Sequence, residues 1–190
     1  MRQHVTISIR ITMALVVITC GLYPAIVWGI GQVAFPRQAN GSLIVRQGKV
    51  IGSELIGQNF VGERFFHPRP SAAGTDGYDG MASGGTNLGP TSKKLRDSIA
   101  ASIRGYSEVR PAIGIPADAV TASASGLDPH ISPENAFAQA PRVARANGLP
   151  AAAMRGLIAR HIERRFLGIY GEPRVNVLLL NLGIEELPGR

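Results

Sequence analysis

The sequence lacks the residues by which disulfide-stabilised domains and metalloproteins are usually recognised. Its 190 residues include a single cysteine, Cys20, so no disulfide framework is expected. His67, His130 and His161 share no spacing that would place them around one ion, and we predict no metal site. An oxidising compartment is therefore neither required nor excluded by the cysteine content.

The sequence also lacks a complete nucleotide-binding or phosphotransfer motif. Residues Gly84 to Thr91 follow the spacing of a phosphate loop, but Pro90 stands where the lysine of that loop belongs. No phospho-aspartate motif is present. Aromatic residues make up only 6% of the chain and do not alternate with its basic residues, so we expect no nucleic-acid partner. Because both motifs are missing, we expect that the chain does not hydrolyse ATP alone.

The most prominent feature that is present is an uncharged run from Ile11 to Phe35, bracketed by Arg10 and Arg37. As a helix it would be roughly 37 Å long, which exceeds the roughly 30 Å hydrocarbon core of a bilayer. We therefore predict a short tail over residues 1–10, a transmembrane helix over 11–35, and a single small mixed α/β soluble domain over 36–190. The expected fold class is α+β with one membrane-spanning helix.

Two alternatives to an uncleaved membrane anchor fit the apolar run less well. A secretory signal has an apolar region of only about 7 to 15 residues and ends at a small-x-small site, which this run does not show. A lipoprotein signal would use Cys20, but Thr19 is larger than such sites favour and an apolar run follows the cysteine. All 13 acidic residues lie after position 35, and basic residues lie on both sides of the run. Charge therefore favours a cytoplasmic N-terminus and an outer soluble domain only mildly.

Within the apolar run, Gly21, Ala25 and Gly29 recur every fourth residue and should lie on one helix face. Small residues allow another helix to approach closely in lipid, so this face is a candidate helix-packing surface. Pro24 lacks the amide that would bond the carbonyl of Cys20, and a kink is expected near that level.

A glycine-rich segment over residues 67–90 is the leading candidate for a functional site in the soluble domain. It is longer than ordinary connections, and such long loops are usually functional or disordered. We interpret it as a docking loop for a partner, with plain flexibility as the alternative. Ser83, Gly84, Gly85, Thr86 and Asn87 are its candidate contact residues.

In the rest of the soluble part, the residue pattern predicts several short helices and strands. A hairpin is expected over 43–46 and 49–52 around Gln47-Gly48, and an extended segment over 119–126. Helices are expected from Thr91 or Ser92 to just before Pro111, from Ser132-Pro133 to Asn147-Gly148, and over about 150–166. In the second of these helices Pro141 predicts a kink, and Ala136, Phe137, Ala140, Val143 and Ala144 should face inward. Residues 174–181 should form a central strand.

Two polar clusters have both a functional and a structural interpretation. Ser125, Asp128 and His130 contain the residue types of a hydrolase triad, but they lie within six positions and should instead form a turn fixed by side-chain hydrogen bonds. A second cluster could meet lipid phosphates or an acidic partner, although it is more often a solvated face. It comprises Arg142, Arg145, Arg155, Arg160, Arg164 and Arg165.

Several blocks of residues, in one order along the chain, resemble the C subunit of the Kdp potassium-transporting ATPase, the KdpC family. The blocks are Gly-x-Tyr-Pro (Gly21, Tyr23, Pro24), Gly-Ser-x-Leu-Ile-Gly-Gln-x-Phe (Gly52 to Phe60), Phe-His-x-Arg-Pro-Ser-Ala (Phe66 to Ala72), Ala-Ser-Gly-Gly-Thr-Asn-Leu-Gly (Ala82 to Gly89), Val-Thr-Ala-Ser-Ala-Ser-Gly-Leu-Asp-Pro-His-Ile-Ser-Pro (Val120 to Pro133) and Arg-Val-Asn-Val-Leu-x-Leu-Asn (Arg174 to Asn181).

The resemblance implies a non-catalytic accessory subunit of a bacterial inner-membrane complex that takes up potassium. Its partners would be a potassium-channel-like subunit, a P-type ATPase subunit and a small peptide subunit. The implied role is to stabilise the assembly and to raise the ATP affinity of the pump subunit, with no cofactor bound by this chain alone. Ser83-Gly84-Gly85 resembles the core of an ABC signature and would make any direct ATP contact. Asp128, Pro129 and His130 form a candidate docking turn. The alternative from the residues is a membrane-anchored periplasmic hydrolase using Ser125 and His130.

Overall fold

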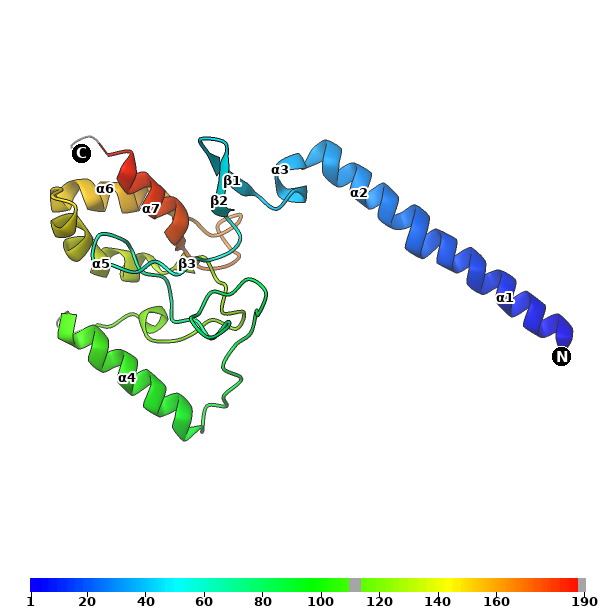
Figure 1. The fold of residues 1–190 in the computed structure, drawn as a ribbon, viewed down its shortest axis with the longest axis horizontal. Coiled ribbons are helices and arrows are strands. Elements are labelled where there is room, and N and C mark those ends of the chain that lie inside the picture. Colours follow the sequence, from blue (N-terminus) through cyan, green and yellow to red (C-terminus); the bar gives the residue numbers. More distant parts are fainter. Residues whose placement is uncertain (110–113, 188–190) are drawn as a thin grey trace. The chain divides into compact units, whose positions relative to one another are not determined.

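The computed structural model describes residues 1–109 and 114–187, and the chain divides into two compact units, residues 1–53 and 54–190 (Figure 1). The first unit contains the apolar helix and a β-hairpin. The second contains the other helices and a small antiparallel sheet. The fold class is therefore α+β with a long N-terminal apolar helix, as predicted.

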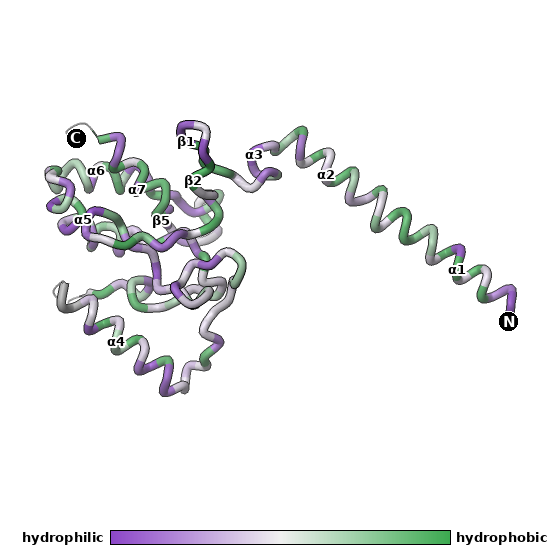
Figure 2. The backbone as a smooth tube through the Cα atoms, viewed as in Figure 1, coloured by the Kyte–Doolittle hydropathy of each residue, from purple (hydrophilic) through white to green (hydrophobic). Residues whose placement is uncertain are grey.

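The apolar helix is continuous from Arg2 to Ala34 and is long and apolar enough to cross a membrane. It consists of α1 (Arg2–Val16), a wider π-helical stretch (Val17–Leu22) and α2 (Tyr23–Ala34). Figure 2 shows apolar residues along most of its length and hydrophilic residues at its N-terminal end. The amide of Tyr23 bonds to the carbonyl of Ile18, five residues back, so the helix departs from α geometry one turn before Pro24.

The rest of the first unit confirms the predicted hairpin. After α3 (Pro36–Ala39), β1 (Leu43–Arg46) pairs antiparallel with β2 (Lys49–Ser53). Gln47 and Gly48 both have positive φ, 49° and 75°, as a two-residue turn between twisted strands requires.

The second unit is built around a three-stranded antiparallel sheet in the order β3 (His130–Ile131), β5 (Arg174–Asn176), β4 (Ile162–Glu163). The helices α5 (Pro133–Ala146), α6 (Ala151–His161) and α7 (Val177–Glu185) lie together, whereas α4 (Lys93–Val109) lies apart from them (Figure 1). A single turn of 3-10 helix covers Ala117–Ala119. The core is formed by Phe66 and by apolar side chains of α5, α6, β5 and α7, including Val143, Met154, Ile158 and Leu180.

The helix boundaries were predicted well where a capping residue marks them. The Ser132 hydroxyl accepts a hydrogen bond from the Asn135 amide at 3.1 Å, with Pro133 as the first helical residue. Gly148, at φ 66°, follows the end of the same helix. Pro141 lies inside a continuous α5.

Three local predictions were wrong. Residues 177–181 form the start of α7 rather than a strand, because the Asn176 side chain accepts a hydrogen bond from the Leu179 amide and caps a helix there. The helix expected to reach Phe166 ends at His161, where β4 begins to pair with β5. Phe137 is 40% exposed, since α5 presents its alanines and Val143 to the core.

Candidate functional site

The glycine-rich segment is organised around one hydroxyl group. The Ser71 Oγ accepts hydrogen bonds from the amides of Ala73 (3.1 Å) and Tyr78 (2.9 Å), and it donates to the carbonyl of Gly126 at 2.6 Å. The Tyr78 hydroxyl in turn donates to the carbonyl of Arg69 at 2.9 Å. These bonds close residues 69–78 into a compact loop and attach it to the turn at residue 126. Burial, reinforced by the nearby Asp128 carboxylate, raises the pKa of Tyr78 to about 12.

Of the predicted contact residues 83–87, the first three pack against residues 124–126. The Gly84 amide (2.8 Å) and the Ser83 hydroxyl (3.1 Å) both donate to the carbonyl of Ser125. A Cβ atom at Gly85 would lie 2.7 Å from the Ala124 carbonyl oxygen, so only glycine fits this approach. Thr86 and Asn87 are exposed. The Ser-Gly-Gly sequence therefore serves a close backbone contact inside the domain.

The predicted docking turn is half-buried, and its polar groups are bonded within the domain. The Asp128 carboxylate accepts a hydrogen bond from the His130 amide (3.0 Å) and faces Arg69 Nη1 (3.2 Å) and His130 Nδ1 (3.3 Å). The carbonyl of Pro129 accepts from the Val177 amide at 2.9 Å. Burial opposes ionisation of Asp128, but the hydrogen bonds and charge of His130, together with Arg69, outweigh it and hold the pKa of that carboxyl below its ordinary value.

The structure does not bring Ser125 and His130 together as a catalytic pair. The Ser125 hydroxyl oxygen accepts a hydrogen bond from the Leu127 amide at 3.1 Å. Both ring nitrogens of His130 face carboxylates, with Nδ1 near Asp128 and Nε2 3.8 Å from Glu163. Among residues 1–109 and 114–187 no hydrogen bond joins the serine to the histidine, and the geometry gives no support to the hydrolase alternative.

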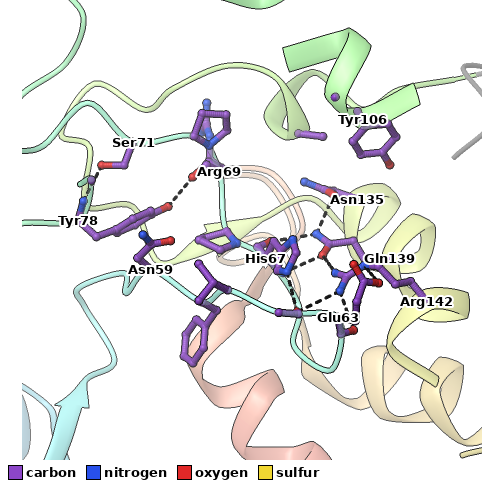
Figure 3. Close-up of a pocket in the computed structure, with 18 of the residues that line it drawn as sticks. Asn59, Glu63, His67, Arg69, Ser71, Tyr78, Tyr106, Asn135, Gln139 and Arg142 are labelled. Atoms are coloured by element: carbon purple, nitrogen blue, oxygen red, sulfur yellow. Dashed lines mark hydrogen bonds and ion pairs between the residues drawn. The ribbon is translucent and has the colours of Figure 1, made fainter. Parts of the chain in front are cut away.

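Sequence reasoning missed a row of buried polar side chains on α5 (Figure 3). Gln139 accepts a hydrogen bond from the His67 amide (2.7 Å) and donates to the His67 carbonyl (2.9 Å), in the manner of a strand partner. Arg142, expected in the basic cluster, is 8% exposed and donates to the carbonyls of Glu63 (2.7 Å) and Phe65 (2.9 Å). The sequence does contain a pattern that indicates this row. Asn135, Gln139 and Arg142 recur at i, i+4 and i+7, next to the apolar Ala136, Ala140 and Val143, which places the polar side chains beside the buried face of the helix.

These side chains form one wall of a cleft of about 470 Å³. Residues 59–63, 67–71 and 76–78 form another wall, and Tyr106 of α4 also lines the cleft (Figure 3). On the neighbouring face, the Asp118 carboxylate accepts hydrogen bonds from the Ser132 amide and hydroxyl and from the Asn135 side chain. In the described part of the chain every buried side-chain nitrogen and oxygen has a partner. The cleft's polar wall thus holds segments of the domain together.

The predicted helix-packing residues lie on the exposed apolar helix. A Cβ atom at Gly21 or Gly29 would meet nothing within 4 Å, so the first unit leaves this surface open. Ala25 and Gly29 keep α-helical spacing in α2, whereas Gly21 lies in the wider turn.

Comparison with known proteins decides the family. The family model described as KdpC, the c chain of the K+-transporting ATPase, matches residues 5–186. The chain belongs to the KdpC family. It is 53% identical over 188 residues to the potassium-transporting ATPase KdpC subunit of Gemmatimonas aurantiaca, covering 98% of this chain and 94% of the relative. It is 50% identical over 184 residues to that of Nitratidesulfovibrio vulgaris, covering 96% and 93%.

A third relative shows that the match extends over whole chains. The KdpC subunit of Methylobacterium nodulans is 46% identical over 201 aligned positions, which span 100% of both chains. The family match therefore includes the apolar helix, the glycine-rich segment and the polar row of α5. The resemblance found in the sequence blocks is confirmed, and this KdpC-family chain is a subunit of the Kdp potassium-transporting ATPase complex.

Proposed function

We propose that this KdpC-family chain is a non-catalytic accessory subunit that stabilises the potassium uptake complex and promotes ATP binding by the subunit that hydrolyses ATP. The observation that carries the proposal is the family match over residues 5–186, joined to an N-terminal helix suited to crossing a membrane. The proposed partners are the potassium-channel-like subunit, the P-type ATPase subunit and the small peptide subunit. Potassium is the transported ion.

The local chemistry of the chain supports a role without catalysis. The Gly84 amide and Ser83 hydroxyl, which would have to meet a phosphate, are bonded to the Ser125 carbonyl instead. Pro90 occupies the position of the phosphate-loop lysine. We therefore propose that any effect on ATP affinity passes through the assembly rather than through ATP bound to this chain.

The proposed location is the bacterial inner membrane, with the N-terminus in the cytoplasm and the second unit on the outer side. The single native cysteine makes this testable by labelling. In a Cys20→Ser background, Met81→Cys places a thiol at a residue that is 98% exposed. An impermeant maleimide should label it in intact spheroplasts and not in inverted vesicles. Labelling only in inverted vesicles would reverse the proposed orientation.

We propose that the face of Gly21, Ala25 and Gly29 packs on a membrane helix of a partner subunit. Gly29→Leu should crowd this face and lower the amount of chain that co-purifies with the complex, because small residues are what permit close helix approach in lipid. Val27→Leu is the matched control, since it adds one methylene two residues away on another face. Equal yields from both variants would contradict the packing proposal.

The effect on ATP binding is measured on the same preparations. Complexes that lack the chain, or that lose it through Gly29→Leu, should show a higher KM for ATP in potassium-stimulated ATPase assays. An unchanged KM and unchanged activity without the chain would contradict the accessory role.

A further inference from the structure

The connection between β4 and β5 carries an exposed apolar turn, residues 166–170, at the end of the hairpin that these strands form. Phe166, Leu167, Ile169 and Tyr170 are 70%, 75%, 73% and 67% exposed. At its base, Ile162 and Glu163 of β4 pair with Val175 and Arg174 of β5, the central strand of the sheet. The turn is thus a direct extension of the core, yet it buries none of its large side chains there.

The backbone of this apolar turn is fixed despite its exposure. Phe166 and Tyr170 exchange hydrogen bonds of 2.8 and 3.0 Å, and the amides of Gly168 and Ile169 bond back to residues 165 and 166. Leu167 has φ 52°, a left-handed conformation that costs a leucine free energy and that glycine or asparagine would adopt more easily. Leu167 adopts this conformation although its side chain is 75% exposed and buries little apolar surface within the domain.

Charged side chains border the apolar turn. Arg165 pairs with Glu172 at 2.6 Å, and Arg174 pairs with Glu163 at 2.8 Å. Arg160 and Arg164 are exposed and have no ion pair among the residues that the structure describes. The turn therefore has an apolar centre and a neutralised rim, and Arg164 beside it is left to meet an external carboxylate.

We propose that the apolar turn 166–170 seats in an apolar recess, bordered by carboxylates, on another protein subunit of the complex. This inference rests on the proposed accessory function and names its docking element. An apolar aromatic centre within a polar rim containing arginine is the usual anatomy of a protein interface. A lipid surface fits less well, because Arg165 and Arg174 are already paired with glutamates, whereas binding to anionic headgroups is typical of clusters of about four to eight basic residues.

The first experiment measures retention in the intact complex. Leu167→Ser and Ile169→Ser should each weaken association roughly tenfold, the loss typical of truncating an interface anchor. Val50→Ser is the matched control, because Val50 is 59% exposed and lies in β2, outside both the turn and the cleft. Normal retention of both turn variants would overturn the proposal.

The second experiment identifies the occupant. In a Cys20→Ser background, Ile169→Cys is labelled with a benzophenone maleimide and the purified complex is irradiated. An adduct with the mass of this chain plus another subunit supports the proposal. An adduct with lipid alone, or with a second copy of this chain, overturns it.

The two proposals fail in distinguishable ways. If complexes lacking the whole chain keep their normal ATPase activity and KM for ATP, the accessory function itself fails. If deletion of the chain impairs the complex, but Leu167→Ser and Ile169→Ser are retained normally and Ile169→Cys crosslinks no partner, only the docking inference fails.

Discussion

The row of polar side chains on α5 predicts that Arg142→Met will destabilise the second unit strongly. The guanidinium donates to the carbonyls of Gly62 (3.3 Å), Glu63 (2.7 Å) and Phe65 (2.9 Å) and to Gln139 Oε1 (2.9 Å). Methionine keeps the length of the stem but supplies no donor. Counting the bonds shorter than 3 Å at about 1 kcal/mol each, the free energy of unfolding should fall by about 3 kcal/mol.

This loss is large enough to measure by thermal unfolding of the full-length chain in detergent. A domain of this size shifts its Tm by about 2–4 °C for each kcal/mol, so Arg142→Met should lower the Tm by about 6–12 °C. Near-UV circular dichroism follows the tertiary packing, and hydrogen exchange should report faster opening of residues 62–67.

The matched control is Arg145→Met, three residues later on the same helix, at an exposed position. Its Tm should change by less than about 2 °C, because surface substitutions rarely exceed about 0.5 kcal/mol. Equal shifts for the two variants, or no change in exchange at residues 62–67, would refute the assignment of Arg142 to the interior.

Two further predictions concern the candidate site. Gly126→Ala should destabilise the domain by about 1–3 kcal/mol. The reason is that φ is 67° at this residue and the new Cβ would lie 2.7 Å from the Gly84 carbonyl oxygen. Chemical denaturation compares this variant with the control Gly80→Ala, whose Cβ meets nothing within 4 Å. Asp128→Asn should make the free energy of unfolding less sensitive to acid. The lowered pKa of Asp128 contributes stability that is present above the ordinary value of 3.8 and is lost as the pH falls through the lower folded pKa. A variant with unchanged acid sensitivity would contradict the cluster with Arg69 and His130.

The features that the sequence predicted correctly are those with a local physical cause. Gln47-Gly48 specified the hairpin because both residues tolerate positive φ. Ser132-Pro133 specified the start of α5, because the hydroxyl caps the amides and proline needs none. The blocks of residues also indicated the family, which the comparisons confirm.

The predictions that failed depended on partners far along the chain. Residues 174–181 looked like one strand by their apolar, β-branched content, but β5 pairs only over 174–176 and Asn176 then caps α7. Arg142 looked like a member of a solvated basic face, because its carbonyl partners lie about 80 positions earlier. The periodicity of apolar residues along a helix contains no information about hydrogen-bond acceptors so far away in the sequence.

By itself, the sequence determined an apolar N-terminal helix, an α+β second part, the capped helix ends and the family. Each of these follows from composition or from interactions between residues a few positions apart. Only the tertiary structure decided that Ser83 and Gly84 bond to Ser125, that His130 faces two carboxylates, and that residues 166–170 stand exposed on the central sheet. Those outcomes depend on which distant segments the packed core brings into hydrogen-bonding distance.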